Sequence, residues 1–176
     1  VGIYLDIKAR YVSDTLIKLL KKYNHPRVII GSFNIELIKE LKKLDSSYLY
    51  SILVPPGFNP FEYAKNADII HLCWEKLEKP EKLLDDNFFQ MCEKKNQKVV
   101  LWHEENPERM KILRNLPVLG ICSNQPELVN PLFKKYSEWP VEVVCHRGLN
   151  SLAPENSLAS TLLALGLGFS HVEIDI

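Results

Sequence analysis

The 176-residue sequence has no long apolar stretch and no excess of charge of either sign. Its apolar runs are about five to eight residues long, whereas a transmembrane helix needs about 20. Lysine and arginine together number 22, as do aspartate and glutamate, so the formal net charge is zero. We therefore expect neither a membrane-spanning segment nor a basic surface that binds nucleic acid. The oligomeric state is not indicated by these features.

Cysteine and glycine are also scarce, and neither occurs in a pattern that defines a site. The four cysteines, none in a C-x-x-C pair, are Cys73, Cys92, Cys122 and Cys145. Most of them lie in or beside apolar segments, so we expect buried free thiols, which favours a reducing compartment. No G-x-G-x-x-G or G-x-x-x-x-G-K-[ST] sequence follows an apolar segment, which argues against a nucleotide-binding fold.

Short β-branched segments alternate with amphipathic segments along the whole chain. Strands are expected at 2–7, 27–31, 49–54, 69–72, 98–102, 118–122, 141–145 and 171–176. Helices are expected between them, including one at 126–138 and one that starts at Pro154. Strict alternation requires parallel strands, and eight of them predict an α/β fold of the (β/α)₈ TIM-barrel type, with an open doubly wound sheet as the alternative. The chain is short for this barrel, which usually has about 250 residues.

Pairs of charged residues end the first and last expected strands. Glu173 and Asp175 lie two residues apart, so both side chains point to one side of their strand, and Asp6 and Lys8 repeat this spacing. The C-terminal ends of all strands open on one face of a barrel, where barrel enzymes place their chemistry. Converging carboxylates repel one another unless a cation joins them, and oxygen ligands suit Mg²⁺ or Ca²⁺. We therefore expect a divalent-cation site at this face.

His146 and Arg147 follow the strand expected at 141–145 and add two further groups. Histidine titrates near neutral pH, and a guanidinium matches the geometry of phosphate oxygens. Taken alone, each charged pair is an ordinary surface feature. Their convergence on one face of a barrel indicates metal-assisted attack on a phosphoester.

Several motifs support this chemistry through a resemblance. They are His146-Arg147-Gly148, Pro154-Glu155-Asn156, Glu173-Ile174-Asp175, Tyr4-Leu5-Asp6-Ile7-Lys8, Ser32-Phe33, Val100-Leu101-Trp102 and Gly120-Ile121-Cys122-Ser123-Asn124-Gln125-Pro126. The first three resemble the N-terminal signature of the glycerophosphodiester phosphodiesterase family, and the others resemble the rest of that family's barrel. The order differs, because the family's first strand here follows its last strand.

The resemblance divides the chain into 1–138, similar to the C-terminal part of the family's barrel, and 139–176, similar to its N-terminal signature. The chain is then a window across tandem domains or a permuted barrel. In both cases we expect the piece that carries the family's second catalytic histidine to be missing. A right-handed β-α-β connection places the strand at 141–145 beside that at 118–122. We therefore expect all eight strands to close into one barrel, with Asp6 close to Glu173 and Asp175.

The resemblance implies a function in glycerol and lipid metabolism: hydrolysis of small-molecule glycerophosphodiesters to glycerol 3-phosphate and an alcohol. It implies that Glu173, Asp175 and Asp6 bind Mg²⁺ or Ca²⁺ and that His146 is a general acid or base. Arg147 and Lys8 would contact phosphoryl oxygens, and Trp102 would line the glycerol pocket unless it belongs to the barrel core.

Three departures from the family pattern reduce the expected activity: Asp6 for glutamate, Asn124 for aspartate and His103 for threonine. His25, His71 and His171 are assigned no role. Two other functions stay open. One is lysophospholipase D-type cleavage, for which an apolar rim beside the site is expected. The other is a non-catalytic barrel repeat that serves as a binding or structural module.

Overall fold

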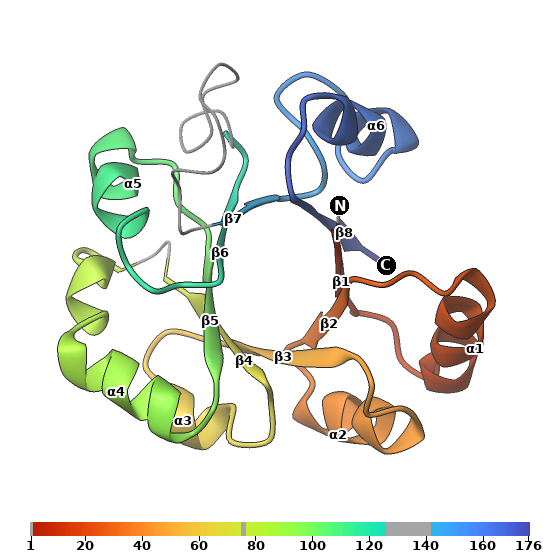
Figure 1. Ribbon diagram of the computed structural model, residues 1–176, viewed down its shortest axis with the longest axis horizontal. Helices are drawn as coiled ribbons and strands as arrows, with labels where there is room; N and C mark the ends of the chain where they lie inside the picture. The colour runs from red at the N-terminus through yellow and green to blue at the C-terminus, as the bar shows by residue number, and fades with distance from the viewer. Residues whose placement is uncertain (1, 75–76, 126–141) are drawn as a thin grey trace.

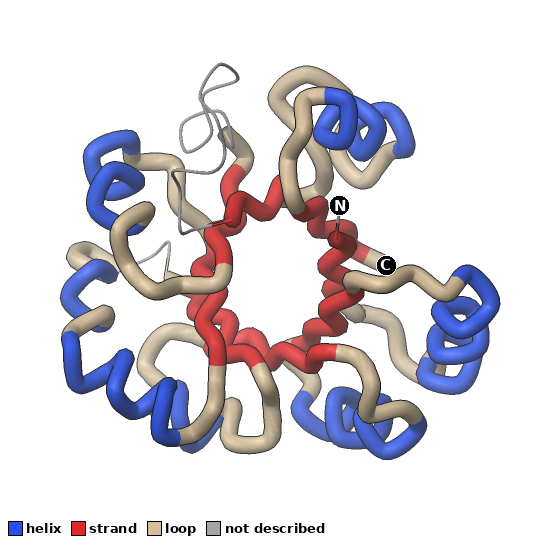
Figure 2. The backbone as a smooth tube through the Cα atoms, in the orientation of Figure 1, coloured by secondary structure: helices blue, strands red, loops and turns tan. Residues whose placement is uncertain are grey.

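The computed structural model describes residues 2–74, 77–125 and 142–176, and within them eight parallel strands close into a barrel (Figure 1). The elements are β1 (Gly2–Asp6), α1 (Ser13–Tyr23), β2 (Val28–Ser32), α2 (Ile35–Leu44), β3 (Leu49–Val54), α3 (Pro60–Tyr63), β4 (Ile69–Cys73), η1 (Pro80–Leu83), α4 (Asp86–Lys94), β5 (Lys98–Trp102), α5 (Pro107–Leu113), β6 (Gly120–Ser123), β7 (Glu142–Cys145), α6 (Leu158–Gly166) and β8 (His171–Asp175). Figure 2 shows the strands as a ring with the helices outside it. The predicted (β/α)₈ barrel is confirmed, and the open sheet is wrong.

Closure of the barrel depends on two strand pairs that the chain order does not make obvious. β7 pairs with β6 through Ser123↔Cys145 and three further residue pairs, as the right-handed connection predicted. β8 then pairs with β1 through five residue pairs, from Gly2↔His171 to Asp6↔Asp175. The first and last strands of the chain thus lie side by side in the barrel (Figure 1). The helix predicted at 126–138 lies outside the described residues.

Most helices begin at a side chain that accepts backbone N–H groups. Asn34, Asn59, Asp85 and Asn106 cap α2, α3, α4 and α5 in this way, as expected for these residue types. The helix predicted to start at Pro154 was placed too early: α6 begins at Leu158, with the Ser157 hydroxyl accepting from Ser160 N. The intervening residues form a turn that belongs to the site described below.

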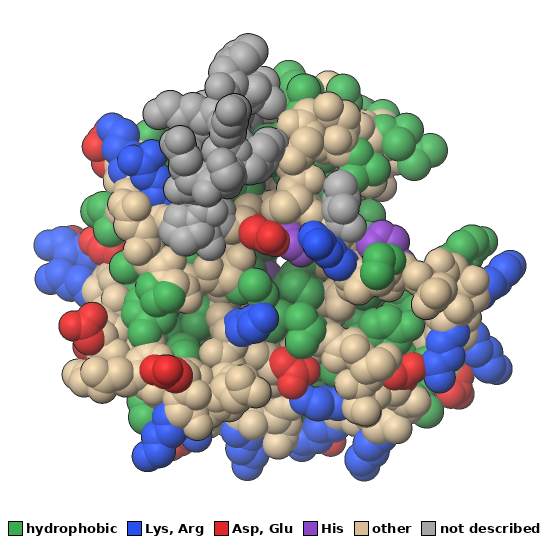
Figure 3. Space-filling model, viewed as in Figure 1, with side chains coloured by type: hydrophobic (Ala, Val, Ile, Leu, Met, Phe, Trp, Pro, Cys, Tyr) green, Lys and Arg blue, Asp and Glu red, His purple; other side chains and the backbone are tan. Residues whose placement is uncertain are grey.

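Two apolar layers hold the barrel together. The larger packs the outer face of the strands against the helices, and the smaller fills the interior with Tyr4, Ile29, Ile69, Val100, Cys122 and Val144. All four cysteines lie in the described part of the chain, are buried and form no disulfide there, which confirms the expectation of buried thiols. No helix in the described part of the chain is both long and apolar enough to cross a bilayer. On the face seen in Figure 3, both acidic and basic side chains of the described residues are scattered around the rim.

A small polar network lies inside the barrel. The hydroxyl of Tyr4 lies 2.7 Å from Ser51 Oγ and 2.6 Å from His71 Nδ1, and all three residues are buried. Cys122 Sγ lies 3.8 Å from His71 Nε2. Burial lowers the pKa of His71 to about 3, with a smaller contribution from His146, so this imidazole is neutral. His71 is therefore a satisfied interior residue.

Candidate active site

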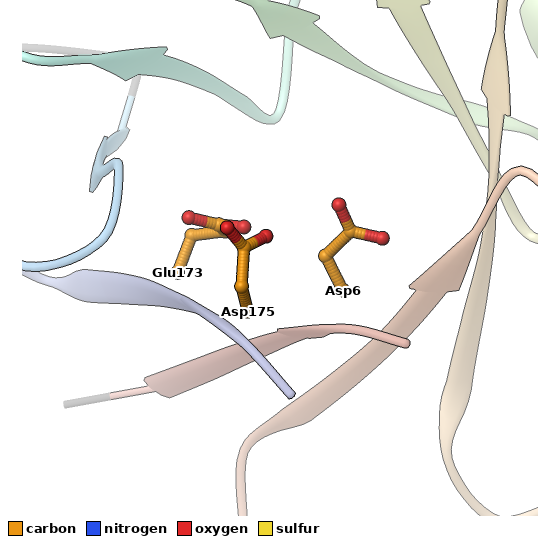
Figure 4. Close-up of side chains that lie close together, drawn as sticks. All are labelled: Asp6, Glu173 and Asp175. Carbon is orange, nitrogen blue, oxygen red and sulfur yellow. The ribbon is translucent and has the colours of Figure 1, made fainter. Parts of the chain in front are cut away.

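Three carboxylates converge at the C-terminal end of the barrel. Asp6 ends β1, while Glu173 and Asp175 lie on β8, and one oxygen of each lies within 4.8 Å of the others. Figure 4 shows the three side chains pointing into the same space from the two neighbouring strands. The register explains this convergence, since Asp6 is paired with Asp175 and Tyr4 with Glu173. The predicted proximity of these residues is confirmed.

The surroundings of the cluster disfavour the ionised forms of two of its carboxylates, Glu173 and Asp6. Burial, with smaller contributions from Asp175 and Asp6, raises the pKa of Glu173 to about 8 against the lowering effect of the Arg147 N–H. Burial also raises the pKa of Asp6, and its Oδ1 is buried without a hydrogen-bond partner among the described residues. An additional cation here would stabilise the ionised carboxylates. The oxygen-only set fits Mg²⁺ or Ca²⁺.

Two side-chain cations already contact Asp175. Lys8 Nζ binds Asp175 Oδ1 and lies 3.5 Å from Asp6 Oδ2. Arg147 Nε lies 2.9 Å from Asp175 Oδ2, and its Nη1 binds Glu155 at 3.1 Å. Although burial acts to raise the pKa of Asp175, these cations outweigh it and the pKa is lowered. Both residues predicted to contact phosphoryl oxygens, Lys8 and Arg147, thus also neutralise the cluster.

The turn between β7 and α6 positions the cluster through its backbone. Arg147 and Asn156 have left-handed φ angles of 58° and 55°, and the Asn156 N–H donates to Arg147 O at 3.0 Å. Arg147 N–H donates to Glu173 Oε2 at 2.8 Å. Asn156 Oδ1 accepts the Asp175 N–H at 3.0 Å. Sequence reasoning gave Asn156 no role, because a side-chain bond to a distant backbone leaves no periodic signal.

His146 follows β7 and is held at both ring nitrogens. Its Nδ1 lies 2.6 Å from Asn124 Oδ1, and Trp102 Nε1 donates to its Nε2 across 3.3 Å. Asn124 Oδ1 also accepts from Asn150 Nδ2 at 2.8 Å, which identifies it as an acceptor and assigns the imidazole proton to Nδ1. Burial lowers the pKa of His146 to about 4, helped by Arg147 and His103. The ring is therefore neutral, with its lone pair at Nε2.

Trp102 lies between the interior layer of the barrel and His146. Its indole is partly buried against the interior layer, and its ring centroid lies 5.9 Å from that of His146 and 6.2 Å from that of Phe33. His103, the next residue, stacks on His146 with ring planes 5° apart and centroids 5.9 Å apart. Of the remaining histidines, His171 starts β8 at the opposite end and pairs with Glu142 at 2.7 Å.

An apolar cavity of about 570 Å³ opens at the C-terminal ends of β3 and β4. Its lining includes Val54, Phe58, Leu72, Trp74, Phe88 and Met91. Two of its polar residues, Asn59 and Asp85, use their side chains to cap helices. The backbone N–H of Trp74 donates to Trp102 O at 2.9 Å, which connects the cavity wall to the strand end that contacts His146.

Comparisons with known proteins agree with this architecture. The model of the glycerophosphoryl diester phosphodiesterase family matches residues 4–128, which include Asp6, Lys8 and Trp102 and end before His146. A putative glycerophosphoryl diester phosphodiesterase from Silicibacter pomeroyi DSS-3 superposes with a TM-score of 0.60 at 13% identity, over 74% of this chain and 49% of that one. A glycerophosphodiester phosphodiesterase from Parabacteroides distasonis ATCC 8503 gives 0.59 at 16%, over 74% and 56%. The chain thus spans about half the length of these structures. Among curated proteins there is no significant match.

Proposed function

Since the chain belongs to the glycerophosphoryl diester phosphodiesterase family, we propose that it hydrolyses glycerophosphodiesters to glycerol 3-phosphate and an alcohol. The observation that carries this proposal is the convergence of Asp6, Glu173 and Asp175 within 4.8 Å at the end of the barrel. Barrel enzymes use this end for catalysis. The substrate is a small molecule with one phosphodiester and a free glycerol hydroxyl beside it.

A divalent cation fits the three carboxylates. One oxygen of each carboxylate lies within 4.8 Å of the others, so the three are close enough to bind one cation together. Carboxylate oxygens suit both Mg²⁺ and Ca²⁺. Asp6 Oδ1 is buried and has no hydrogen-bond partner in the described part of the chain, which supports direct ligation despite the shorter side chain of aspartate. When bound, the cation supplies positive charge for the phosphoryl oxygens.

The residues around the cluster transfer the proton and stabilise the developing charge. His146 Nε2 carries the lone pair and accepts the proton of the glycerol hydroxyl that attacks phosphorus, in place of the Trp102 N–H that donates to it across 3.3 Å. Asn124 keeps this tautomer by accepting from Nδ1 at 2.6 Å. The guanidinium of Arg147 and the ammonium of Lys8 stabilise negative charge that develops on the phosphoryl oxygens. The resulting cyclic phosphate is opened by water.

Calorimetry and a hydrolysis assay test this proposal together. We expect the chain to bind Ca²⁺ or Mg²⁺ and to release choline from glycerophosphocholine only when the cation is present. Asp6→Asn and Glu173→Gln should lose both properties, whereas Glu36→Gln, an exposed carboxylate of α2, should keep both. A wild-type chain that binds neither cation and cleaves nothing would contradict the proposal and favour a non-catalytic barrel repeat.

A second candidate, lysophospholipase D-type cleavage, is favoured by the apolar cavity at the same end of the barrel. Its volume of about 570 Å³ lies in the range of small-molecule sites, and an acyl chain could enter it past Phe58, which is 58% exposed. Phe58→Ser should then lower kcat/KM for lysophosphatidylcholine and leave that for glycerophosphocholine unchanged. Equal effects on both substrates would remove this candidate.

A further inference from the structure

Two imidazoles share the site, although only one was expected there. We propose that His103 is the second acid–base group of the reaction, which donates a proton to the departing alcohol while His146 accepts one from the attacking hydroxyl. This inference rests on the proposed phosphodiesterase activity. Cleavage of a phosphodiester by a neighbouring hydroxyl needs both a base and an acid, and His146 can be only one of them in a given step.

The relative position of the two rings suits this division. His103 follows β5 and His146 follows β7, yet their ring planes differ by only 5° and their centroids lie 5.9 Å apart. An acid or base acts over about 2.6–3.2 Å. Two groups at this separation can therefore contact different oxygens of one phosphoryl group.

The charged groups around the two rings differ in sign. His103 Nε2 lies 3.8 Å from Glu105 Oε1, and this oxygen is held in place by the N–H of Asn124 at 2.7 Å. The His103 ring thus lies beside a fixed carboxylate. His146 instead faces the cations Arg147 and Lys8, with Asp175 as the opposing charge. The two rings thus lie among charges of opposite sign, which suits one ring to the role of acid and the other to that of base.

The hydrogen bonding of His103 also leaves it available. At 3.8 Å its Nε2 is too far from Glu105 for a hydrogen bond, so a proton there can be donated elsewhere. Its Nδ1 is buried and has no hydrogen-bond partner among the described residues. A histidine that served only to support the loop would be expected to pair its buried nitrogen. A purely structural role therefore does not explain the surroundings of His103 Nδ1.

The proton balance is complete with these two residues. In the first step the glycerol oxygen bonds to phosphorus and its proton passes to His146 Nε2. The bond between phosphorus and the alcohol oxygen breaks, and that oxygen receives the proton of His103. In the second step water attacks phosphorus of the cyclic phosphate and His103 takes a proton from it. The bond between phosphorus and the glycerol oxygen that attacked in the first step breaks, and that oxygen receives the proton of His146. One water is consumed and both histidines are restored.

The test compares two substrates that share glycerol 3-phosphate and differ in the leaving group, choline or p-nitrophenol. Nitrophenolate leaves without prior protonation, whereas an alkoxide requires it. His103→Asn should lower kcat/KM for glycerophosphocholine by about 10²–10⁴-fold and for the nitrophenyl ester by less than about tenfold. A loss that is equal for both substrates, or no loss, would overturn the role of His103 and leave the proposed function standing.

Two further variants guard against a folding defect. Glu105→Gln keeps an oxygen acceptor for Asn124 N–H but removes the charge, so it should give a smaller loss with the same dependence on the leaving group. If circular dichroism shows that His103→Asn is unfolded, the leaving-group dependence of Glu105→Gln decides whether the proposal holds. His25→Asn, which changes a loop histidine before β2, should behave as wild type. A wild-type chain inactive on both substrates would overturn this inference and the proposed function together.

Discussion

The phenol of Tyr4 fills the space that a side chain on Gly31 would need. A Cβ placed on Gly31 would lie 2.5 Å from the Tyr4 hydroxyl oxygen and 2.8 Å from its ring. Tyr4 is fully buried, and its hydroxyl is engaged with Ser51 and His71. The ring therefore cannot move aside without giving up these contacts. Glycine at this position of β2 allows a bulky residue beneath Asp6.

Gly31→Ala should therefore destabilise the barrel. Overpacking of this kind costs about 1–3 kcal/mol, because rings and backbone must shift. Urea unfolding followed by circular dichroism measures the loss. Gly166→Ala is the matched control, since nothing lies within 4 Å of its added methyl group; its stability should be unchanged or higher by up to about 1 kcal/mol. Equal stabilities of the two variants would show that Tyr4 can relocate freely.

Asn156→Gly should weaken cation binding without large loss of stability. Glycine accepts the left-handed φ of 55°, but it removes the carboxamide that holds Asp175 N–H at 3.0 Å. Loss of such a supporting group typically lowers metal affinity by about 10–100-fold. Calorimetric titration with Ca²⁺ measures the change. Asn24→Gly, at φ 44° after α1, makes the same change away from the cluster and should retain wild-type affinity.

Glu104→Gln should lower the free energy of unfolding by about 1.5–3 kcal/mol, the range for hydrogen bonds to charged groups. Glu104 is buried, accepts the N–H groups of Glu105 and Asn106, and pairs with Arg109 Nη1 at 2.9 Å. In contrast, the exposed Glu108 pairs with Lys111 across one helical turn. Glu108→Gln should change stability by less than about 0.5 kcal/mol. A similar effect of the two substitutions in chemical denaturation would refute this assignment.

The buried His71 predicts a loss of stability in mild acid. Its pKa falls from an unfolded value of 6.5 to about 3 in the folded chain, so below pH 6.5 the unfolded state binds a proton that the folded state does not. Stability is fully present above pH 6.5 and declines as pH drops toward 3, by about 1.4 kcal/mol per pH unit. His71→Asn should show a shallower decline than wild type between pH 6.5 and 5 in urea titrations. Parallel declines would mean that His71 is protonated in the folded state.

The barrel was predictable because its signals are local and repeated. Alternating elements gave the parallel strands, and caps such as Asn34 and Asn106 marked helix starts. The carboxylate cluster was predictable because two-residue spacing fixes side-chain direction at both Asp6 and Glu173. Closure of β8 on β1 then brings those directions together.

The failures have a different physical origin. Pro154 predicted a helix start, but Asn156 adopts a left-handed conformation and delays α6 to Leu158. The stacking of His103 on His146 joins residues from strands that are not adjacent. Such contacts depend on three-dimensional closure, and no pattern within one segment of sequence contains them.

The pairing of β1 with β8 also sets when the carboxylate cluster can exist during folding. Lys8 and Asp175, which touch across this seam, are 167 residues apart in the chain. Contacts between such distant segments carry the largest loop-closure entropy and form slowly. Asp6 lies near Glu173 only when β8 has paired with β1. A bound cation would then stabilise the pairing of β1 with β8. It would change the refolding rate only through this closing step and not through the earlier steps.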